Sequence, residues 1–221
     1  MKKIKDHSLY LVLSEECGRG RPAIELARLA ISGGIDMLQM REKERPCSEL
    51  IKLGHELCGI CKEKKVNFIV NDDPILAKEL NADGVHLGQE DVKKHGLTNT
   101  RKLLGPDKII GISTHSLDQF KKANEQDFDY IAFGPIFPTK TKDYFIGTSD
   151  VNNILNIAKK PTVFIGGVNI DNVDALLDMG AKNIALIRAI LEADDVTAAT
   201  SIFKEKIELK REGAYEAKNK R

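Results

Sequence analysis

Hydroxyl and basic side chains gather in residues 129–143, which read DYIAFGPIFPTKTKD. The apolar start of this segment, residues 130–133, predicts a short buried strand. Pro135 and Pro138 then stiffen the chain, because proline fixes φ and removes a backbone donor. The Thr-Lys-Thr-Lys run that follows would present hydroxyl and ammonium groups where the strand ends, which suits an anionic ligand. Taken alone, the run could also be a solvated loop.

Acidic residues follow two other apolar runs, where each is expected to end as a strand. Asn71-Asp72-Asp73 precedes a proline, and Asp91 lies a few residues after His86. Asp73 fits a helix N-cap, which leaves Asp72 without a structural role. If the two strands are neighbours, Asp72 and Asp91 can approach each other. Such a pair suits Mg²⁺, which takes a few carboxylates plus water and substrate phosphates. Asp91 could equally cap the next helix.

A polar row formed by Gln39, Arg41 and Lys43 alternates with the apolar Met40. Because side chains alternate along a strand, these three should share one face and Met40 should pack under the helices. A buried polar row is costly without partners, so we favour a ligand over a capping salt-bridge network.

Two further expected strand ends carry polar or glycine residues. The spacing of Ser116 and Gln119 predicts a helix capping box, which would leave Ser113 and His115 without a structural role, although a single histidine is usually structural. Gly166-Gly167 precede a helix, and glycines at a helix N-terminus allow a phosphate to approach the backbone.

These clusters need a scaffold that brings many strand ends together. Apolar runs alternate with amphipathic runs, which implies a parallel sheet with right-handed crossovers. The predicted strands cover 9–13, 35–41, 66–71, 84–87, 109–112, 130–133, 162–165 and 184–187, and the predicted helices about 22–32, 48–64, 74–80, 99–104, 117–124, 151–158, 170–179 and 196–209. Eight such units suit a single α/β domain, a (β/α)8 TIM barrel, better than a doubly wound open sheet.

In such a barrel, chemistry sits at the C-terminal ends of the strands. The clusters described above follow the second to seventh predicted strands, and Arg188 follows the eighth. The opposite ends carry mostly ordinary turn residues. We therefore expect a site for two anionic groups, one of them held through a metal.

Composition excludes several other classes of function. The net charge of +1 and the pI of about 7.7 offer no electrostatic case for nucleic acid. No apolar run approaches the ~20 residues of a membrane span, and residues 9–13 are too short for a signal-peptide core. We expect a cytoplasmic protein with one domain over 1–221, whose charged tail frays after about residue 209. Cys58 and Cys61 lack the further ligands of a zinc site and are expected to be reduced, structural thiols.

Together and in this order, the motifs resemble the thiamine-phosphate synthase family, from Leu9 to about Ala199. The resemblance rests on Gln39-x-Arg41-x-Lys43, Asn71-Asp72, the run from Asp83 to Gln89 followed by Asp91, and Gly134-Pro135-x-Phe137-Pro138-Thr139-x-Thr141-Lys142. It implies a transferase of thiamine biosynthesis that joins 4-amino-2-methyl-5-(diphosphooxymethyl)pyrimidine to 4-methyl-5-(2-phosphooxyethyl)thiazole. The implied reaction depends on Mg²⁺, releases pyrophosphate with thiamine phosphate, and passes through a carbocation-like step.

The resemblance also implies roles by position. The pyrimidine diphosphate would be held by Gln39, Arg41, Lys43, Asn71, Ser113 and Lys142, and of these Arg41, Lys43, Ser113 and Lys142 would act in catalysis. The thiazole phosphate would be held by Thr139, Thr141, Gly167, and the backbone at Ile187 and Arg188. Asp72 and Asp91 would hold Mg²⁺, and Lys140 receives no role. Arg188 departs from the family, which usually has a small residue there; an arginine can pair with phosphate or crowd its pocket.

Three other functions stay open. A thiazole tautomerase of the same fold would not need the two carboxylates. A non-catalytic thiamine-phosphate binding protein would use the same pocket, and a sugar-phosphate isomerase would need a general base, for which His86 and His115 are the candidates. The expected partners are small-molecule substrates, without nucleic acid or membrane, and a homo-oligomer is possible. The loop at 134–149, with Gly147 as a hinge, is expected to close as a lid.

Overall fold

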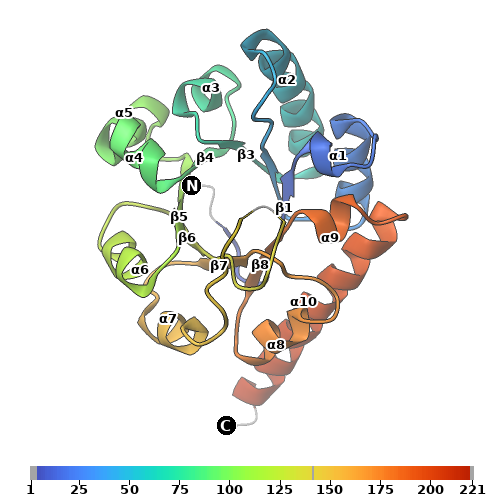
Figure 1. The fold of residues 1–221 in the computed structure, drawn as a ribbon, viewed down its shortest axis with the longest axis vertical. Coiled ribbons are helices and arrows are strands. Elements are labelled where there is room, and N and C mark those ends of the chain that lie inside the picture. The colour runs from blue at the N-terminus through green and yellow to red at the C-terminus, as the bar shows by residue number, and fades with distance from the viewer. Residues whose placement is uncertain (1–3, 141, 220–221) are drawn as a thin grey trace.

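Eight parallel strands pair in chain order, and the eighth closes on the first to form a barrel. The structure, a computed structural model, describes residues 4–140 and 142–219. The strands are β1 Leu9–Leu13, β2 Met37–Met40, β3 Asn67–Asn71, β4 Gly84–Leu87, β5 Ile109–Thr114, β6 Tyr130–Phe133, β7 Thr162–Ile165 and β8 Asn183–Leu186. Helices surround this barrel as a ring (Figure 1). The predicted (β/α)8 TIM barrel is confirmed.

The connecting helices differ from the prediction in several places. They are α1 Ala23–Ser32, α2 Cys47–Lys64, α3 Pro74–Glu79, α4 Gln89–His95, α5 Leu97–Leu104, α6 Leu117–Asn124, α7 Val151–Ile157, α8 Val173–Asp178, α9 Arg188–Leu191 and α10 Val196–Asn219, with a 3-10 turn at Glu15–Cys17. The prediction missed α4, which has no buried residue and therefore no apolar periodicity, and α9, which is a single turn. The last helix continues past residue 209 to Asn219; whether its end frays stays a prediction.

Strand alternation divides the core into two clusters. Side chains that point outward, such as Leu11, Leu38 and Met40, pack against the helices. Those that point inward, such as Tyr10 and Met37, fill the barrel. Met40 therefore packs under the helices as predicted. The prediction for β2 itself was too long at both ends, because the strand covers only Met37–Met40.

Acidic side chains fasten the strands together at the N-terminal end of the barrel. Three aspartates immediately precede β2, β4 and β6: Asp36, Asp83 and Asp129. Their carboxylates accept hydrogen bonds from the backbone N–H of the preceding strand, at Leu9 (2.8 Å), Phe68 (2.9 Å) and Ile110 (2.8 Å). Asn183, at the start of β8, accepts in the same way from Ser8 (3.0 Å). This end of the barrel is thus built for stability.

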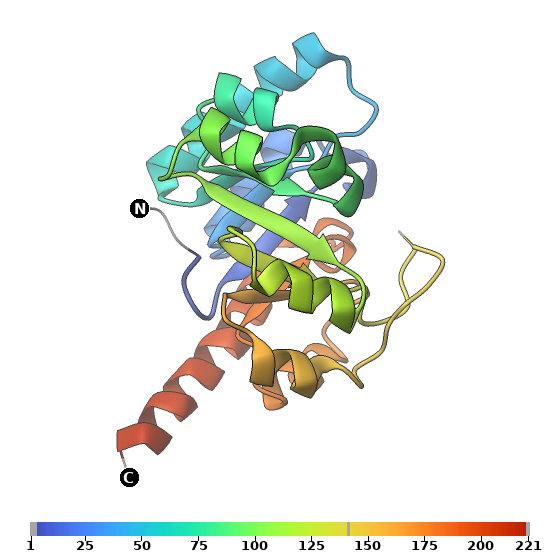
Figure 2. The same cartoon turned by 90° about the vertical axis from the view of Figure 1, so that its left-hand side faces the viewer.

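The loop from β6 to α7 stands out from the barrel at the opposite end (Figure 2). Its base is fixed, because Ile136 N–H bonds to the Ile165 carbonyl (3.0 Å) and Phe137 N–H to the Gly166 carbonyl (2.9 Å). The chain returns to this base at Ile146, whose N–H bonds to the Pro135 carbonyl (2.7 Å). Backbone hydrogen bonds therefore fix both ends of the loop. Within 4–140 and 142–219, no helix is long and apolar enough to cross a membrane.

Candidate active site

A cavity of about 420 Å³ opens at the C-terminal ends of the strands. All eight strands contribute a wall residue to it, and the loops after β6, β7 and β8 complete it. Nine residues predicted for substrate binding line this cavity: Gln39, Arg41, Asn71, Ser113, Thr139, Lys142, Gly167, Ile187 and Arg188. One predicted residue, Thr141, lies outside the described part of the chain. The strand ends therefore converge as the barrel topology requires.

Lys43 is placed differently from the prediction. It is exposed and is not among the residues that line the cavity, because β2 ends at Met40 and strand alternation stops there. Its ammonium group instead acts on the Asp72 carboxylate, whose charged form it favours. Lys140, for which no role was expected, does line the cavity.

The carboxyl groups of Asp72 and Asp91 meet beside the cavity. Asp72 has left-handed backbone geometry (φ 64°), and its N–H bonds to the His86 carbonyl (2.8 Å), which ties the end of β3 to β4. Burial, and then a hydrogen bond and charge repulsion from Asp91, raise the pKa of Asp72 from 3.8 to about 6. The Asn71 side chain opposes this shift by bonding to the charged form.

The neighbouring acidic residues have structural duties. Asp73 caps α3 as predicted, accepting from the N–H groups of Ile75 (2.8 Å) and Leu76 (3.0 Å). Asp91 accepts from the Gly88 N–H (2.9 Å) in the first turn of α4, so it caps this helix while it also faces Asp72. The two alternatives for Asp91 are therefore compatible.

The carboxyl pair fits an ion that is shared with a substrate. Among the described residues, no group of three or more His, Cys, Asp or Glu side chains gathers as a metal cage. Two adjacent carboxylates that compete for one proton are a donor set that Mg²⁺ uses when phosphate oxygens and water complete its shell. Magnesium binding at Asp72 and Asp91 stays a prediction.

A chain of hydrogen bonds runs through the barrel interior below the cavity. Gln39 Nε2 donates to Tyr10 Oη (2.7 Å), and Tyr10 Oη lies 2.9 Å from Tyr130 Oη. Tyr130 Oη in turn lies 2.7 Å from His86 Nδ1, and His86 Nε2 lies 2.8 Å from Ser113 Oγ. Tyr10 and Tyr130 were not predicted as site residues, because an aromatic residue in an apolar run is expected to be core.

His115 is a structural tie. Its Nδ1 lies 2.5 Å from the Gly134 carbonyl, which links the loop after β5 to the loop after β6. Ser116 accepts the Gln119 N–H (3.2 Å) as predicted for the cap, but the Gln119 side chain accepts from the His115 N–H instead of completing the box at Ser116.

The glycines after β7 let two loops pack closely. Gly166 (φ +97°) and Gly167 (φ +68°) both have backbone geometry that favours glycine. A Cβ on Gly167 would lie 2.4 Å from the Pro138 carbonyl oxygen, and a Cβ on Gly166 would lie 2.3 Å from the Pro135 ring. Both positions thus exclude a side chain. The loop after β6, which carries Pro138 and Thr139, therefore packs directly against the loop after β7, which carries Gly166 and Gly167.

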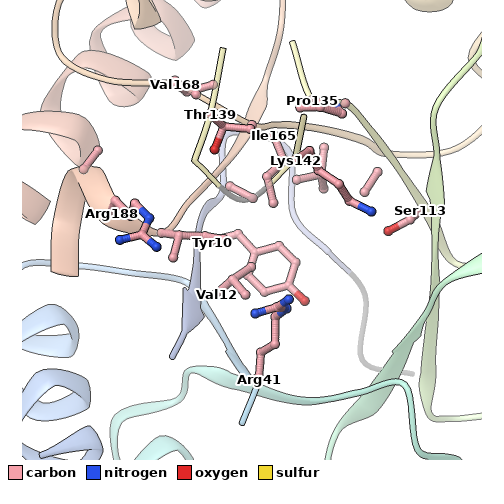
Figure 3. Close-up of a pocket in the computed structure, with 18 of the residues that line it drawn as sticks. Tyr10, Val12, Arg41, Ser113, Pro135, Thr139, Lys142, Ile165, Val168 and Arg188 are labelled. Atoms are coloured by element: carbon pink, nitrogen blue, oxygen red, sulfur yellow. The ribbon is translucent and has the colours of Figure 1, made fainter. Parts of the chain in front are cut away.

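Arg188 reaches the cavity from the start of α9. Its guanidinium Nη1 pairs with Glu192, which also lines the cavity, and Nη2 lies 3.8 Å from Glu16. The buried Nε has no hydrogen-bond partner among the described residues. Figure 3 shows Arg188 on one side of the cavity, with Lys142 and Ser113 on the other. The cavity thus has basic groups on two sides.

Comparison with known proteins agrees with this geometry. Residues 9–190 match the family described as thiamine monophosphate synthase. The chain belongs to this family. The matched region contains every predicted site residue, and α10 lies beyond it. The resemblance inferred from the motifs is confirmed, and with it the expectation of a transferase.

Individual members of the thiamine monophosphate synthase family are similar over nearly the whole chain. The thiamine-phosphate synthase of Moorella thermoacetica is 39% identical over 200 residues, which is 89% of this chain and 94% of that protein. The solved thiamine phosphate pyrophosphorylase of Pyrococcus furiosus superposes with a TM-score of 0.83 at 33% identity, covering 92% and 96% of the two chains. The (S)-3-O-geranylgeranylglyceryl phosphate synthase of Thermoplasma acidophilum shares only the fold (TM-score 0.66, 16% identity, 90% of this chain and 92% of that one).

Proposed function

We propose that the chain is a thiamine-phosphate synthase, which couples the pyrimidine diphosphate and the thiazole phosphate named above to form thiamine phosphate and pyrophosphate. The observation that carries the proposal is one cavity of about 420 Å³ that Arg41, Lys142 and Arg188 line. We assign the diphosphate to the part of the cavity near Arg41, Lys142 and the adjacent carboxyl pair, and the thiazole phosphate to the part near Gly167 and Arg188. The names of the family relatives support the same reaction.

The diphosphate end would stabilise the leaving group. Asp72 and Asp91 would hold Mg²⁺, which when bound neutralises charge that develops on the departing pyrophosphate. Arg41 and Lys142 are positioned to add hydrogen bonds and positive charge, because both line the cavity. Lys43, exposed beside Asp72, would act on the outer side of the diphosphate.

The thiazole end would hold a phosphate monoester. Thr139 offers a hydroxyl, Gly167 an approach to the backbone, and the Ile187–Arg188 turn a further backbone contact. These groups come from the loops after β6, β7 and β8, and the last two of these loops often bind phosphate in TIM barrels.

The reaction would then depend on how the two substrates are held relative to each other, and no protein side chain would act as a nucleophile. The C–O bond of the pyrimidinylmethyl diphosphate breaks, and its electron pair leaves with pyrophosphate. The resulting carbocation is captured by the lone pair of the thiazole nitrogen, which forms the C–N bond. The chain's residues hold the two substrates in line, which lowers the entropic cost of their reaction. The loop 134–149 would exclude water from the cation as a lid.

Incubation of the purified protein with both substrates tests the proposal. Thiamine phosphate and pyrophosphate should appear in equal amounts with Mg²⁺ and disappear when EDTA is added. A thiazole tautomerase would instead act without the diphosphate substrate, and a binding protein would bind thiamine phosphate without turnover. Absence of product with Mg²⁺ present would contradict the proposed function. We also expect, as predictions, a cytoplasmic protein that can form a homo-oligomer.

A further inference from the structure

The hydrogen-bonded chain from Gln39 to Ser113 joins opposite walls of the barrel. It runs from β2 through Tyr10 on β1 and Tyr130 on β6 to His86 on β4, and ends on β5. Its inner members are almost completely buried, with Tyr10 2%, Tyr130 0% and His86 7% exposed. A buried polar group is costly unless it is hydrogen-bonded. Removal of one member would therefore leave its neighbours in this hydrogen-bonded series without a partner.

Packing fixes the aromatic rings of this chain. Tyr130 stacks on His86, with ring centroids 5.4 Å apart and an interplanar angle of 27°, and meets Tyr10 edge-on at 6.1 Å. Gly111 on β5 makes room for the Tyr130 phenol, since a Cβ there would lie 2.1 Å from a ring carbon. These contacts hold the Tyr130 hydroxyl beside its two partners.

The donors along the chain point one way. Each ring nitrogen of His86 has one hydroxyl partner, Tyr130 Oη at Nδ1 and Ser113 Oγ at Nε2, and a neutral ring has one donor and one acceptor nitrogen. With the Gln39 amide nitrogen donating to Tyr10, the Tyr10 hydrogen goes to Tyr130 and the Tyr130 hydrogen to His86 Nδ1. The opposite direction requires the Gln39 amide to be turned over, so that its oxygen accepts the Tyr10 hydrogen.

The last hydrogen bond then decides the role of Ser113. In this direction of the hydrogen bonds, His86 Nε2–H donates to Ser113 Oγ, and the hydroxyl hydrogen of Ser113 is left for the cavity that this residue lines. The Ser113 backbone is held as well, because Gln89 Nε2 donates to its carbonyl (2.6 Å).

We propose that His86, Tyr130 and Tyr10 are positioning residues that hold Ser113 as a one-way hydrogen-bond donor to the bound pyrimidine diphosphate. The proposal rests on the proposed function, which supplies this ligand. None of the three residues needs to touch the reacting atoms; each acts by fixing the direction of the hydrogen bond that follows it.

A double-mutant cycle tests this role. Tyr130→Phe removes one hydroxyl and should lower kcat about 10-fold while the KM for the thiazole phosphate stays unchanged. In a Ser113→Ala background, Tyr130→Phe should cause no further loss, because it acts through Ser113. Losses that multiply in the double variant, or an unchanged kcat in Tyr130→Phe, would overturn the proposal.

Two further variants separate positioning from packing. His86→Gln keeps an N–H group near the Nε2 position and should restore most of the kcat that His86→Leu loses. Thr114→Val is the matched control, since the buried Thr114 hydroxyl bonds to the Ala132 carbonyl (2.8 Å) and takes no part in the hydrogen bonds from Gln39 to Ser113. It should lower the Tm without changing kcat; a kcat loss like that of Tyr130→Phe would indicate a general packing effect and overturn the proposal.

The ¹⁵N NMR spectrum of His86 gives a readout that needs no turnover. A protonated Nε2 and an unprotonated Nδ1 in the wild-type protein support the proposed direction, and the other tautomer or a charged ring overturns it. If the wild-type protein makes no thiamine phosphate, the proposed function fails, whereas the direction of the chain is still decided by this spectrum.

Discussion

The carboxyl groups of Asp72 and Asp91 are hydrogen-bonded to each other above the neighbouring strands β3 and β4. Asp72 follows β3 directly in a left-handed conformation, whereas Asp91 lies in the first turn of α4. The contact forces one carboxyl group to retain a proton at a higher pH than usual. A cation that replaces this proton would remove the repulsion and gain two ligands.

Loss of either carboxylate should therefore impair turnover. Asp72→Asn and Asp91→Asn should each reduce kcat about 100-fold at saturating substrates, because an amide is a poor magnesium ligand. Asp73→Asn is the adjacent control: asparagine still caps α3, so its kcat and stability should remain close to the wild type. Steady-state kinetics over a range of Mg²⁺ concentrations measure this, and wild-type rates in both site variants would remove the metal hypothesis.

The raised pKa of Asp72 predicts a pH-dependent stability in the absence of Mg²⁺. The folded state holds the proton with a pKa of about 6, against 3.8 for the ordinary side chain, so this contribution to stability is complete below pH 3.8. It is lost as the pH rises through about 6. Asp72→Asn should therefore stabilise the protein at pH 8, by roughly 1–2 kcal/mol relative to its effect at pH 4, because solvent screens this partly exposed carboxyl group. Urea denaturation in EDTA measures this difference, and a variant effect that is equal at the two pH values would contradict it.

The sequence predicted the barrel and most of its cavity because both depend on local patterns. The strands at 9–13, 84–87, 130–133 and 162–165 agree at both ends, since they are short, mostly apolar runs bounded by polar, glycine or proline residues. Polar residues at strand ends, such as Asn71 and Ser113, were found because the topology assigns chemistry to those ends.

Features that depend on contacts between distant strands could not be predicted. The Tyr10–Tyr130 contact joins residues 120 positions apart, and each tyrosine alone is typical of an apolar core. Asp36, Asp83 and Asp129 looked like ordinary turn residues, because their function is a hydrogen bond to another strand. Lys43 was expected on the same face as Gln39 and Arg41 because strand alternation was extended beyond the end of β2.

Substitution of Gly167 should disturb the thiazole phosphate end. A Cβ in Gly167→Ala would lie 2.4 Å from the Pro138 carbonyl oxygen and push the Thr139 loop away, so the KM for the thiazole phosphate should rise at least 10-fold. Gly180→Ala is the matched control, because Gly180 also has a positive φ (+100°) but the nearest atom to its Cβ would be 3.8 Å away. It should lose stability without a change in KM. Equal KM values in the two variants would show that the Gly167 loop does not contact the substrate.

Arg188 and Glu192 should set the affinity for the same phosphate. Arg188→Ser should leave kcat largely intact but change the KM for the thiazole phosphate, because the guanidinium faces the cavity. Glu192→Gln should lower that KM, since the guanidinium that Glu192 now pairs would become available to phosphate. Arg19→Ala serves as the control and should change neither constant, because Arg19 is not among the described residues that line the cavity and bonds instead to Asp194 and to the backbone carbonyl of Glu192 (2.9 Å). An unchanged KM in Arg188→Ser would mean that Arg188 does not contact the phosphate.

The acidic residues at the N-terminal end of the barrel should affect stability alone. Asp129 accepts the Ile110 N–H (2.8 Å) and pairs with Arg101 (2.7 Å), whose side chain is only 17% exposed. Asp129→Ala leaves a buried N–H unsatisfied and should cost about 1–3 kcal/mol of unfolding free energy. Asp127 pairs with the same arginine but is 74% exposed, so Asp127→Ala should cost less than about 1 kcal/mol.

Urea denaturation of the two variants measures this difference, and kcat should match the wild type in both because the site lies at the other end of the strands. A loss of kcat in folded Asp129→Ala would show that the N-terminal end of the barrel transmits its geometry to the site, and equal unfolding free energies in the two variants would show that the hydrogen bond to Ile110 contributes nothing. The expected result separates the stabilising end of this barrel from its catalytic end, as the fold predicts.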